Sequence, residues 1–203
     1  MLLETERLIC EPAAPGHRDF AVELFGNPEV ARWIWPEGRD GPDAIGPRTP
    51  EQAEQLLRRF VADWEANGFG WWCVRERASG MPVGEVVVQR ATVDGAPVVE
   101  VGWMLLPAYW GRGYATEAGR AVIDIARKGL RLPKLSAGHF TDNPASGRVL
   151  EKLGFRPIGR IAARYSAGRG AAAPCKLFEF DLTAEAKTEA KEAPVRDTMA
   201  ACA

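Results

Sequence analysis

The amino-acid sequence predicts a single domain of the mixed α/β class, with a mostly antiparallel central sheet and flanking helices. The chain has 203 residues, of which 46% are hydrophobic, so it is long enough to bury one sizeable core. Three successive apolar runs, at 69–74, 83–88 and 98–106, are separated by the turn pairs Ser79-Gly80 and Asp94-Gly95. Turns of this kind are typical of antiparallel hairpins, so the middle of the chain is predicted to be a three-stranded meander.

The elements before the meander follow from apolar spacing and helix-start residues. Residues 2–11 are predicted to form an opening strand, and residues 20–25 part of a short first helix. The segment Thr49-Pro50-Glu51-Gln52 has the form of a capping box with proline in the first turn, and Gly68 ends the helix that it starts. One apolar face runs along that helix and is formed by Ala53, Leu56, Leu57, Phe60, Val61 and Trp64.

After the meander, helices and strands alternate. The predicted elements are, in order, a loop at 107–113, a helix stopped by Gly129, a strand at 135–140, a short helix capped by Asn143-Pro144 and ended by Gly154, and strands at 155–161 and 177–182. The domain is therefore predicted to span residues 1–183. The tail over 184–203 alternates Ala, Glu and Lys with few large apolar residues, so we expect it to be mobile or weakly helical.

Composition also predicts the compartment and the partners. No uncharged run approaches the roughly 20 residues that span a bilayer. Acidic residues occupy the start of the chain, where a signal peptide carries basic ones. The four cysteines (Cys10, Cys73, Cys175 and Cys202) are far apart, which favours a compartment that keeps thiols reduced. We therefore expect a cytoplasmic protein with no membrane partner and no direct nucleic-acid partner.

Several common catalytic motifs are missing from the sequence. The absence of GxxxxGK[ST] excludes a P-loop nucleotidase, and the absence of GxSxG excludes the usual serine-hydrolase elbow. The two histidines, His17 and His139, have no cysteine or acid at metal-ligand spacing, so we expect no metal site.

The net charge of −1 conceals a separation of charge along the chain. Residues 1–100 carry a net charge of −7, and residues 101–183 carry +7. Such asymmetry suggests an anionic ligand at the second half and a cationic ligand at the first. The alternative is that the fold interleaves the two halves, and the charge count alone leaves both open.

The segment from Leu105 to Thr116 is the most informative part of the sequence. A strand is predicted to end here and to pass through Gly111 and Gly113 straight into a helix. The first turn of a helix carries unpaired N–H groups and the positive end of the helix dipole, and glycines let an anion approach the backbone. This arrangement predicts a phosphate or pyrophosphate ligand, with an ordinary strand–turn–helix connection as the alternative.

Four motifs in this order resemble those of the GNAT N-acetyltransferases, in particular the RimJ/RimL-like branch. The segment Trp110-Gly111-Arg112-Gly113-Tyr114-Ala115 resembles the Q/R-x-x-G-x-G/A loop of that family, with Trp110 at the Q/R position. The further matches are Leu3-Glu4-Thr5-Glu6-Arg7-Leu8, Glu100-Val101-Gly102-Trp103, and Asn143-Pro144-Ala145-Ser146 followed by Glu151-Lys152-Leu153-Gly154-Phe155. The resemblance covers residues 2–183.

The resemblance implies a fold in which two central strands separate and acetyl-CoA lies in the gap. Backbone groups of Met104, Leu105 and Leu106 would then bind the pantetheine arm, and Asn143 would bind it from the other side. The pyrophosphate would be held by the loop, helped by the Arg112 side chain. The loop residues concerned are Gly111, Arg112, Gly113, Tyr114, Ala115 and Thr116.

The same resemblance implies where the chemistry takes place. The backbone N–H of Leu105 would stabilise the oxyanion that forms during acetyl transfer. The tyrosine that many relatives carry seven residues after the asparagine is missing, since Leu150 occupies that position. In the RimL-like pattern a serine protonates the departing thiolate, and Ser146 occupies its position. A local contact in the first turn of the helix is the alternative for Ser146.

The general base is less well defined by the sequence. Some relatives carry a glutamate five residues before the asparagine, where this chain has Gly138. Glu100 is therefore our first candidate for the base, acting directly or through water, and Glu85 is the second. A mechanism without a dedicated base is the alternative, because water can carry the proton once the amine is desolvated.

The acceptor is expected to be a primary amine, and in the resembled branch it is a protein N-terminus. A small-molecule amine and a non-catalytic acyl-CoA-binding module are the alternatives. Trp33 and Trp35 are candidate walls of the acceptor site, and Tyr165 with residues 166–173 is a candidate cover for it. The sequence does not define the oligomeric state.

Overall fold

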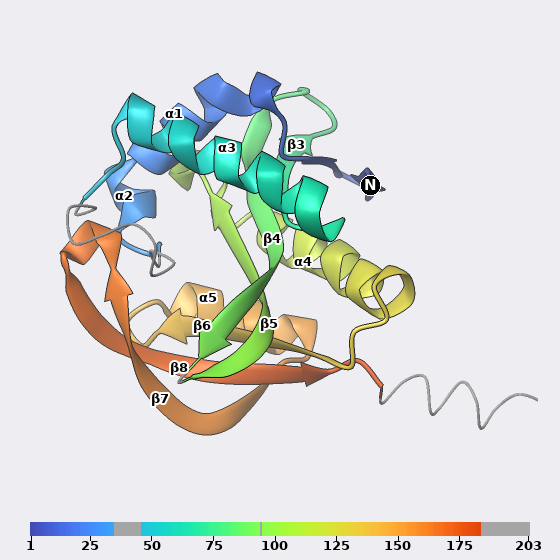
Figure 1. Ribbon diagram of the computed structural model, residues 1–203, viewed down its shortest axis with the longest axis vertical. Helices are drawn as coiled ribbons and strands as arrows, with labels where there is room; N and C mark the ends of the chain where they lie inside the picture. Colours follow the sequence, from blue (N-terminus) through green and yellow to red (C-terminus); the bar gives the residue numbers. More distant parts are fainter. Residues whose placement is uncertain (35–45, 94, 184–203) are drawn as a thin grey trace, which may run out of the picture.

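In the computed structural model, residues 1–34, 46–93 and 95–183 form one mixed sheet with helices on both faces (Figure 1). The strands are β1 (Leu3–Glu4), β2 (Leu8–Pro12), β3 (Trp71–Glu76), β4 (Pro82–Val93), β5 (Ala96–Leu105), β6 (Lys134–Phe140), β7 (Arg156–Ser166) and β8 (Ala171–Asp181). Their order in the sheet is β1-β2-β3-β4-β5-β6-β8-β7. All neighbours are antiparallel except β5 and β6, so the predicted fold class and the predicted meander are confirmed.

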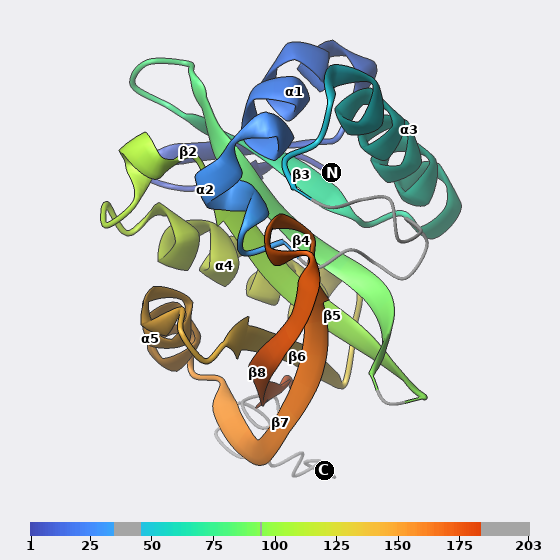
Figure 2. The ribbon, with the colours of Figure 1, turned by 90° about the vertical axis from the view of Figure 1, so that its left-hand side faces the viewer.

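The helices divide between the two faces of the sheet (Figures 1 and 2). One face is covered by α1 (Arg18–Gly26), α2 (Pro28–Ala31) and α3 (Pro50–Asn67), whose apolar side chains share two core clusters with β3 and β5. The other face is covered by α4 (Tyr114–Asp124) and α5 (Pro144–Leu153), which contribute to the largest core cluster. Short helical turns occur at Pro15–His17, Pro107–Tyr109, Ala167–Arg169 and Ile125–Gly129.

Local capping signals in the sequence correctly located the helix starts. The Thr49 hydroxyl accepts a hydrogen bond from the Gln52 N–H (3.3 Å), and the Gln52 side chain accepts one from the Thr49 N–H (3.0 Å), which completes the predicted capping box. The Asn143 side chain accepts a hydrogen bond from the N–H of Ser146 (3.2 Å) at the start of α5. Gly154 ends α5 in the left-handed conformation, with φ of 88°.

Several predicted elements differ in the structure. The strands predicted at 155–161 and 177–182 are longer, since β7 reaches Ser166 and β8 begins at Ala171, which shortens the loop expected at 166–173. The single opening strand is divided into β1 and β2, because Thr5 and Leu8 form a turn in which the Leu8 N–H donates to the Thr5 hydroxyl (3.0 Å). The helix predicted to reach Gly129 changes after Asp124 into a π-helical turn, Ile125–Gly129. The tail over 184–203, Trp35 and Asp94 lie outside the described residues.

The pairing between β5 and β6 is the feature of the fold that positions the site. A single register pair, Glu100 with Ser136, joins these two parallel strands. Beyond it, β5 continues beside β4 as far as Leu105, while β6 continues beside β8. The sheet therefore opens between its two halves next to the end of β5. Within the described part of the chain, no helix is both long and apolar enough to cross a membrane.

Candidate active site

A cavity of about 1180 Å³ occupies the opening between β5 and β6 and extends to both faces of the sheet. On the face of α4 and α5 its lining includes Trp110, Gly111, Ala115, Asn143 and Ser146. On the face of α1 and α2 its lining includes Trp33, Ile34, Trp71, Glu100, Met104 and Arg164. One continuous cavity therefore connects the predicted coenzyme loop with the predicted acceptor side.

The end of β5 presents backbone groups to this opening. The Leu106 N–H donates to the Val83 carbonyl of β4 (3.0 Å). Successive residues of a strand direct their N–H and C=O groups to opposite neighbours, so the groups of Leu105 face away from β4. The Leu105 N–H thus points into the gap, as the oxyanion role expected for it requires.

Trp110 already contacts the same backbone position. Its indole N–H donates to the Leu105 carbonyl (2.7 Å), while 44% of the residue remains exposed. The tryptophan that replaces the Q/R residue of the family loop therefore supplies a donor to a carbonyl that the open sheet leaves without a strand partner.

The loop before α4 has the geometry expected of an anion site. Gly111 and Gly113 have φ of 74° and 83°, a region that favours glycine, and Gly113 is the N-cap of α4. The next three amides, those of Tyr114, Ala115 and Thr116, have no acceptor within the helix because they lie in its first turn. This helix start fits a pyrophosphate, and no side chain caps it.

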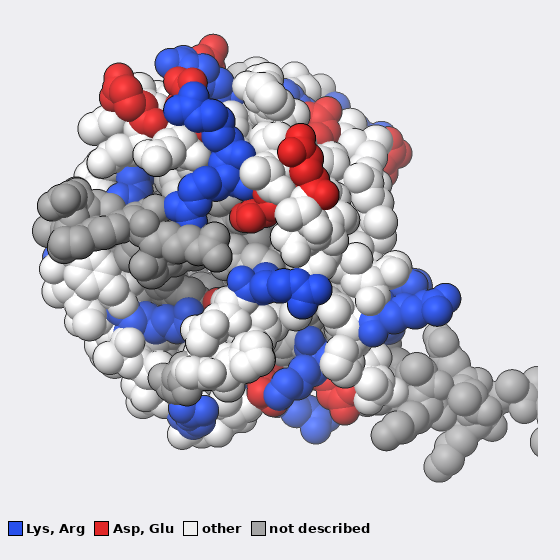
Figure 3. All heavy atoms as spheres, viewed as in Figure 1, with Lys and Arg blue, Asp and Glu red and all other residues white. Residues whose placement is uncertain are grey.

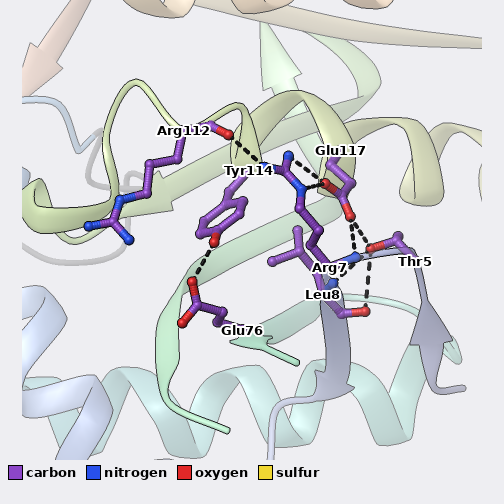
Figure 4. Close-up of polar contacts among 7 residues, drawn as sticks. All are labelled: Thr5, Arg7, Leu8, Glu76, Arg112, Tyr114 and Glu117. Atoms are coloured by element: carbon purple, nitrogen blue, oxygen red, sulfur yellow. Dashed lines mark hydrogen bonds and ion pairs between the residues drawn. The ribbon is translucent and has the colours of Figure 1, made fainter. Parts of the chain in front are cut away.

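Side chains from distant parts of the chain hold this loop (Figure 4). The Arg7 guanidinium donates to the Arg112 carbonyl (3.0 Å) and to the Glu117 carboxylate through Nε (2.7 Å), and it lies over the Tyr114 ring (4.8 Å). The Tyr114 hydroxyl points away from the cavity and donates to Glu76. The sequence analysis gave no role to Arg7 or Glu117.

Asn143 and Ser146 lie together at the start of α5. The Asn143 Oδ1 caps the helix through the Ser146 N–H, which leaves the Asn143 amide nitrogen available to a ligand. Ser146 lines the cavity, and its hydroxyl makes no hydrogen bond within the described ranges. The alternative for Ser146 was a local contact in the first turn of the helix. In the structure the Asn143 side chain makes that capping contact.

Glu100 lines the cavity as part of an ion pair. Its carboxylate accepts hydrogen bonds from Arg164 of β7 at 2.6 and 3.5 Å, and only 4% of the residue is exposed.

Ion pairs connect the acidic and basic halves of the sequence. Glu100 belongs to the acidic half and pairs with Arg164 of the basic half. Arg7 belongs to the acidic half and pairs with Glu117 of the basic half, so each half supplies both signs of charge. Figure 3 likewise shows both signs of charge in the upper and lower parts of one face. In these pairs of described residues, the fold interleaves the charges of the two halves.

Glu85 lies outside the cavity lining. It is 2% exposed, pairs in register with Cys73 and Met104, and its Oε2 has no hydrogen-bond partner. Burial raises the pKa of Glu85 to about 8, so the carboxyl group is protonated at neutral pH. The structure therefore does not bring the second candidate base to the reacting groups.

A cluster of side chains lies at the acceptor side of the cavity near α2. Arg169 donates two hydrogen bonds to the Asp142 carboxylate (2.8 and 2.9 Å) and stacks on the Trp33 ring (5.1 Å). The Ser166 hydroxyl donates to the Arg32 carbonyl (2.8 Å), which joins the β7–β8 turn to α2. The turn expected to cover the acceptor site thus lies against α2.

The predicted site residues fall into two groups. The cavity lining includes Glu100, Met104, Leu105, Gly111, Ala115, Asn143 and Ser146. The lining does not include Glu85, Leu106, Arg112, Gly113, Tyr114 and Thr116. Among the described residues, no group of three His, Cys, Asp or Glu side chains has the arrangement of a metal site.

The chain belongs to the GNAT acetyltransferases, because the family described as "Acetyltransferase (GNAT) domain" matches residues 7–156. The uncharacterized N-acetyltransferase YoaA of Bacillus subtilis is 28% identical over 158 residues, which cover 78% of this chain and 84% of that protein. The resemblance stated from the motifs is therefore confirmed. The protein is an acetyl-CoA-dependent acetyltransferase, and the loop before α4 fits the pyrophosphate of that coenzyme.

Solved structures confirm the fold. The ribosomal-protein-S5-alanine acetyltransferase of Vibrio fischeri has a TM-score of 0.72 at 22% identity, covering 91% of this chain and 98% of that one. Mutant forms of the spermidine/spermine N-acetyltransferase SpeG of Vibrio cholerae have a TM-score of 0.68 at 17% identity, covering 91% of this chain and 99% of theirs. Their names give different acceptors, so the fold alone leaves the acceptor of this chain open.

We predict that Gly113→Val abolishes coenzyme binding. A β-branched residue at φ of 83° strains the loop, and its side chain would press on the Arg7 guanidinium, because a Cβ at this position lies 3.4 Å from Nη2. Coenzyme A at about 100 times its Kd stabilises the wild type by about 2.7 kcal/mol, measured from thermal unfolding. Gly80→Val is the matched control, because Gly80 has φ of 69° in a remote turn. A normal shift in Gly113→Val contradicts the placement of the pyrophosphate.

We also predict that buried Glu85 makes the protein less stable as pH rises from about 4.5 to 8. The folded state keeps the proton up to about pH 8, whereas the unfolded state loses it near 4.5, so the free energy of unfolding falls through this window. The slope is at most about 1.4 kcal/mol per pH unit and is absent in Glu85→Gln. Urea titrations of both proteins at pH 5, 6.5 and 8 measure it. Parallel pH profiles contradict the assignment.

Proposed function

We propose that the protein transfers the acetyl group of acetyl-CoA to the N-terminal amine of a protein or peptide. The observation that carries this proposal is the chemistry of the acceptor side of the cavity. Apolar side chains form much of its lining there, including Trp33, Ile34, Trp71 and Met104. Such walls suit the first side chains of a peptide.

The paired charges of this region favour a single amine over a polyamine. Glu100 is held by Arg164 (2.6 Å), and Asp142 is held by Arg169 (2.8 Å). A polyamine carries several positive charges and is bound well where several carboxylates are free to pair with it. Two of the three carboxylates in the described lining are instead neutralised by arginines, which leaves only Asp63 to attract a further ammonium group.

Three groups of the chain are assigned to the reaction. The Leu105 N–H would donate to the thioester oxygen as negative charge develops there. Ser146 would donate to the departing thiolate sulfur, which is a better leaving group when it accepts a proton. Glu100 would accept the proton of the amine, directly or through water, since its oxygens retain lone pairs beside Arg164.

The acceptor proposal predicts that peptides with a free N-terminus are acetylated and that spermidine is not. Release of free CoA is measured with a panel of peptides, their N-terminally blocked counterparts, spermidine and single amino acids. Blocked peptides that contain lysine are the control for side-chain acetylation. Faster turnover of spermidine than of the free peptides overturns the peptide proposal. Coenzyme binding without turnover of any amine indicates the non-catalytic module.

Ser146→Ala is predicted to lower kcat by about 100-fold or more, with little change in acetyl-CoA affinity. The hydroxyl matters mainly as the thiolate leaves, so its loss is felt in the transition state and not in coenzyme binding. Ser146→Thr keeps a hydroxyl and is expected to retain much of the activity. If kcat of Ser146→Ala equals that of the wild type while chemistry limits turnover, the role assigned to Ser146 is wrong.

A further inference from the structure

We infer that Arg7 is a positioning residue for the coenzyme: it holds the Arg112–Gly113 peptide in the orientation that presents the loop amides to the pyrophosphate. The inference rests on the proposed binding of the coenzyme at this loop, and it adds the N-terminal segment to the coenzyme site. Figure 4 shows Arg7 between the loop and the first turn of α4.

Arg7 is held firmly by the first turn of α4. The Glu117 carboxylate accepts hydrogen bonds from Nε (2.7 Å) and from the backbone N–H (2.8 Å) of Arg7, and its Oε2 forms an ion pair with Nη2 (2.6 Å). The Thr5 hydroxyl donates to the same carboxylate (2.6 Å). Glu117 thereby fixes both the backbone and the side chain of a segment 110 residues away in sequence. One carboxylate oxygen holds the backbone N–H and the other holds the guanidinium, so the contact defines the orientation of Arg7 as well as its distance.

The remaining nitrogen of Arg7 acts on the loop itself. Its Nη1 donates to the Arg112 carbonyl (3.0 Å), and a Cβ at Gly113 would lie 3.4 Å from Nη2. The C=O and N–H of a trans peptide point in opposite directions. A carbonyl of Arg112 directed at Arg7 therefore directs the Gly113 N–H away from Arg7. Because Gly113 has no Cβ, the peptide has many accessible orientations, and an external contact is needed to select one.

Tyr114 holds the other side of the loop. Arg7 lies over its ring (4.8 Å), and its hydroxyl donates to Glu76 of β3. This hydrogen bond raises the pKa of Tyr114, so the phenol keeps its proton and remains a donor. The loop is thus ordered before the coenzyme arrives, which lowers the conformational cost of binding.

A direct electrostatic role for Arg7 makes the opposite prediction for one variant. If Arg7 bound the phosphate by its charge, Glu117→Gln would strengthen coenzyme binding, because it removes a negative charge beside the site and frees the guanidinium. If Arg7 acts by position, Glu117→Gln weakens coenzyme binding, because the orientation of Arg7 is lost. The sign of this change separates the two roles.

The test is isothermal titration of coenzyme A into the full chain, combined with steady-state kinetics. Arg7→Ala is expected to lower coenzyme affinity by about tenfold or more, the factor for losing a charge-assisted hydrogen bond. The KM for acetyl-CoA is expected to rise in step, while kcat at saturating acetyl-CoA stays within about twofold of the wild type. Glu117→Gln is expected to weaken binding as well.

Arg77→Ala is the matched control. Arg77 donates to the carbonyl of Thr5 (3.1 Å) and pairs with Glu4 (3.3 Å), so it holds the same N-terminal segment without touching the loop. The side chains of Arg7 and Arg77 are 44% and 42% exposed. The control is expected to bind coenzyme A normally. Thermal unfolding without ligand shows whether each variant is folded.

Three results overturn the inference. The first is wild-type affinity in a folded Arg7→Ala, and the second is tighter binding by Glu117→Gln. The third is an equal loss in Arg7→Ala and Arg77→Ala, because it traces the effect to the segment as a whole. If the wild type itself does not bind coenzyme A, the assignment of the coenzyme site to this loop is wrong. That result is distinct from a failure of the role proposed for Arg7.

Discussion

The separation of β5 from β6 is the constraint on which the site depends. Strands in a sheet satisfy their backbone groups through their neighbours, and an opening between two strands leaves such groups without partners. Beyond the pair of Glu100 with Ser136, Leu105 faces this opening. Its carbonyl is satisfied by the Trp110 indole (2.7 Å), while its N–H faces the cavity. The opening therefore leaves a backbone donor beside the cavity that an intact sheet would have consumed.

Contacts between residues distant in the sequence hold the two halves of the open sheet in place. On the acceptor side, Glu100 of β5 pairs with Arg164 of β7, and Arg32 at the end of α2 pairs with Asp142 after β6. On the coenzyme side, Arg7 joins the segment before β2 to the loop before α4. Arginines thus neutralise two of the carboxylates in the described lining, and we propose that shape and hydrogen bonding dominate acceptor recognition there.

Sequence reasoning succeeded where the signal is local. The capping box at Thr49, the Asn143 cap and the hairpin turns each depend on residues within four positions of one another. The division of the opening strand depends instead on Thr5, whose hydroxyl bonds Leu8 and also Glu117. Arg7 and Glu117 are 110 residues apart, so no spacing rule connects them. The candidate role of Glu85 as a base was limited in a similar way. The packing of α1 buries its side of β4, and no local sequence pattern indicates this burial.

Amide hydrogen exchange followed by NMR, with and without coenzyme A, shows directly whether the opening between β5 and β6 holds the coenzyme. We expect the coenzyme to protect the amides of Leu105, Tyr114, Ala115 and Thr116, which lack partners in the open sheet and in the first turn of α4. The Leu106 amide, already bonded to the Val83 carbonyl (3.0 Å), is expected to change little. Protection confined to other parts of the sheet, or equal protection of Leu105 and Leu106, would contradict the opening between β5 and β6 as the coenzyme site.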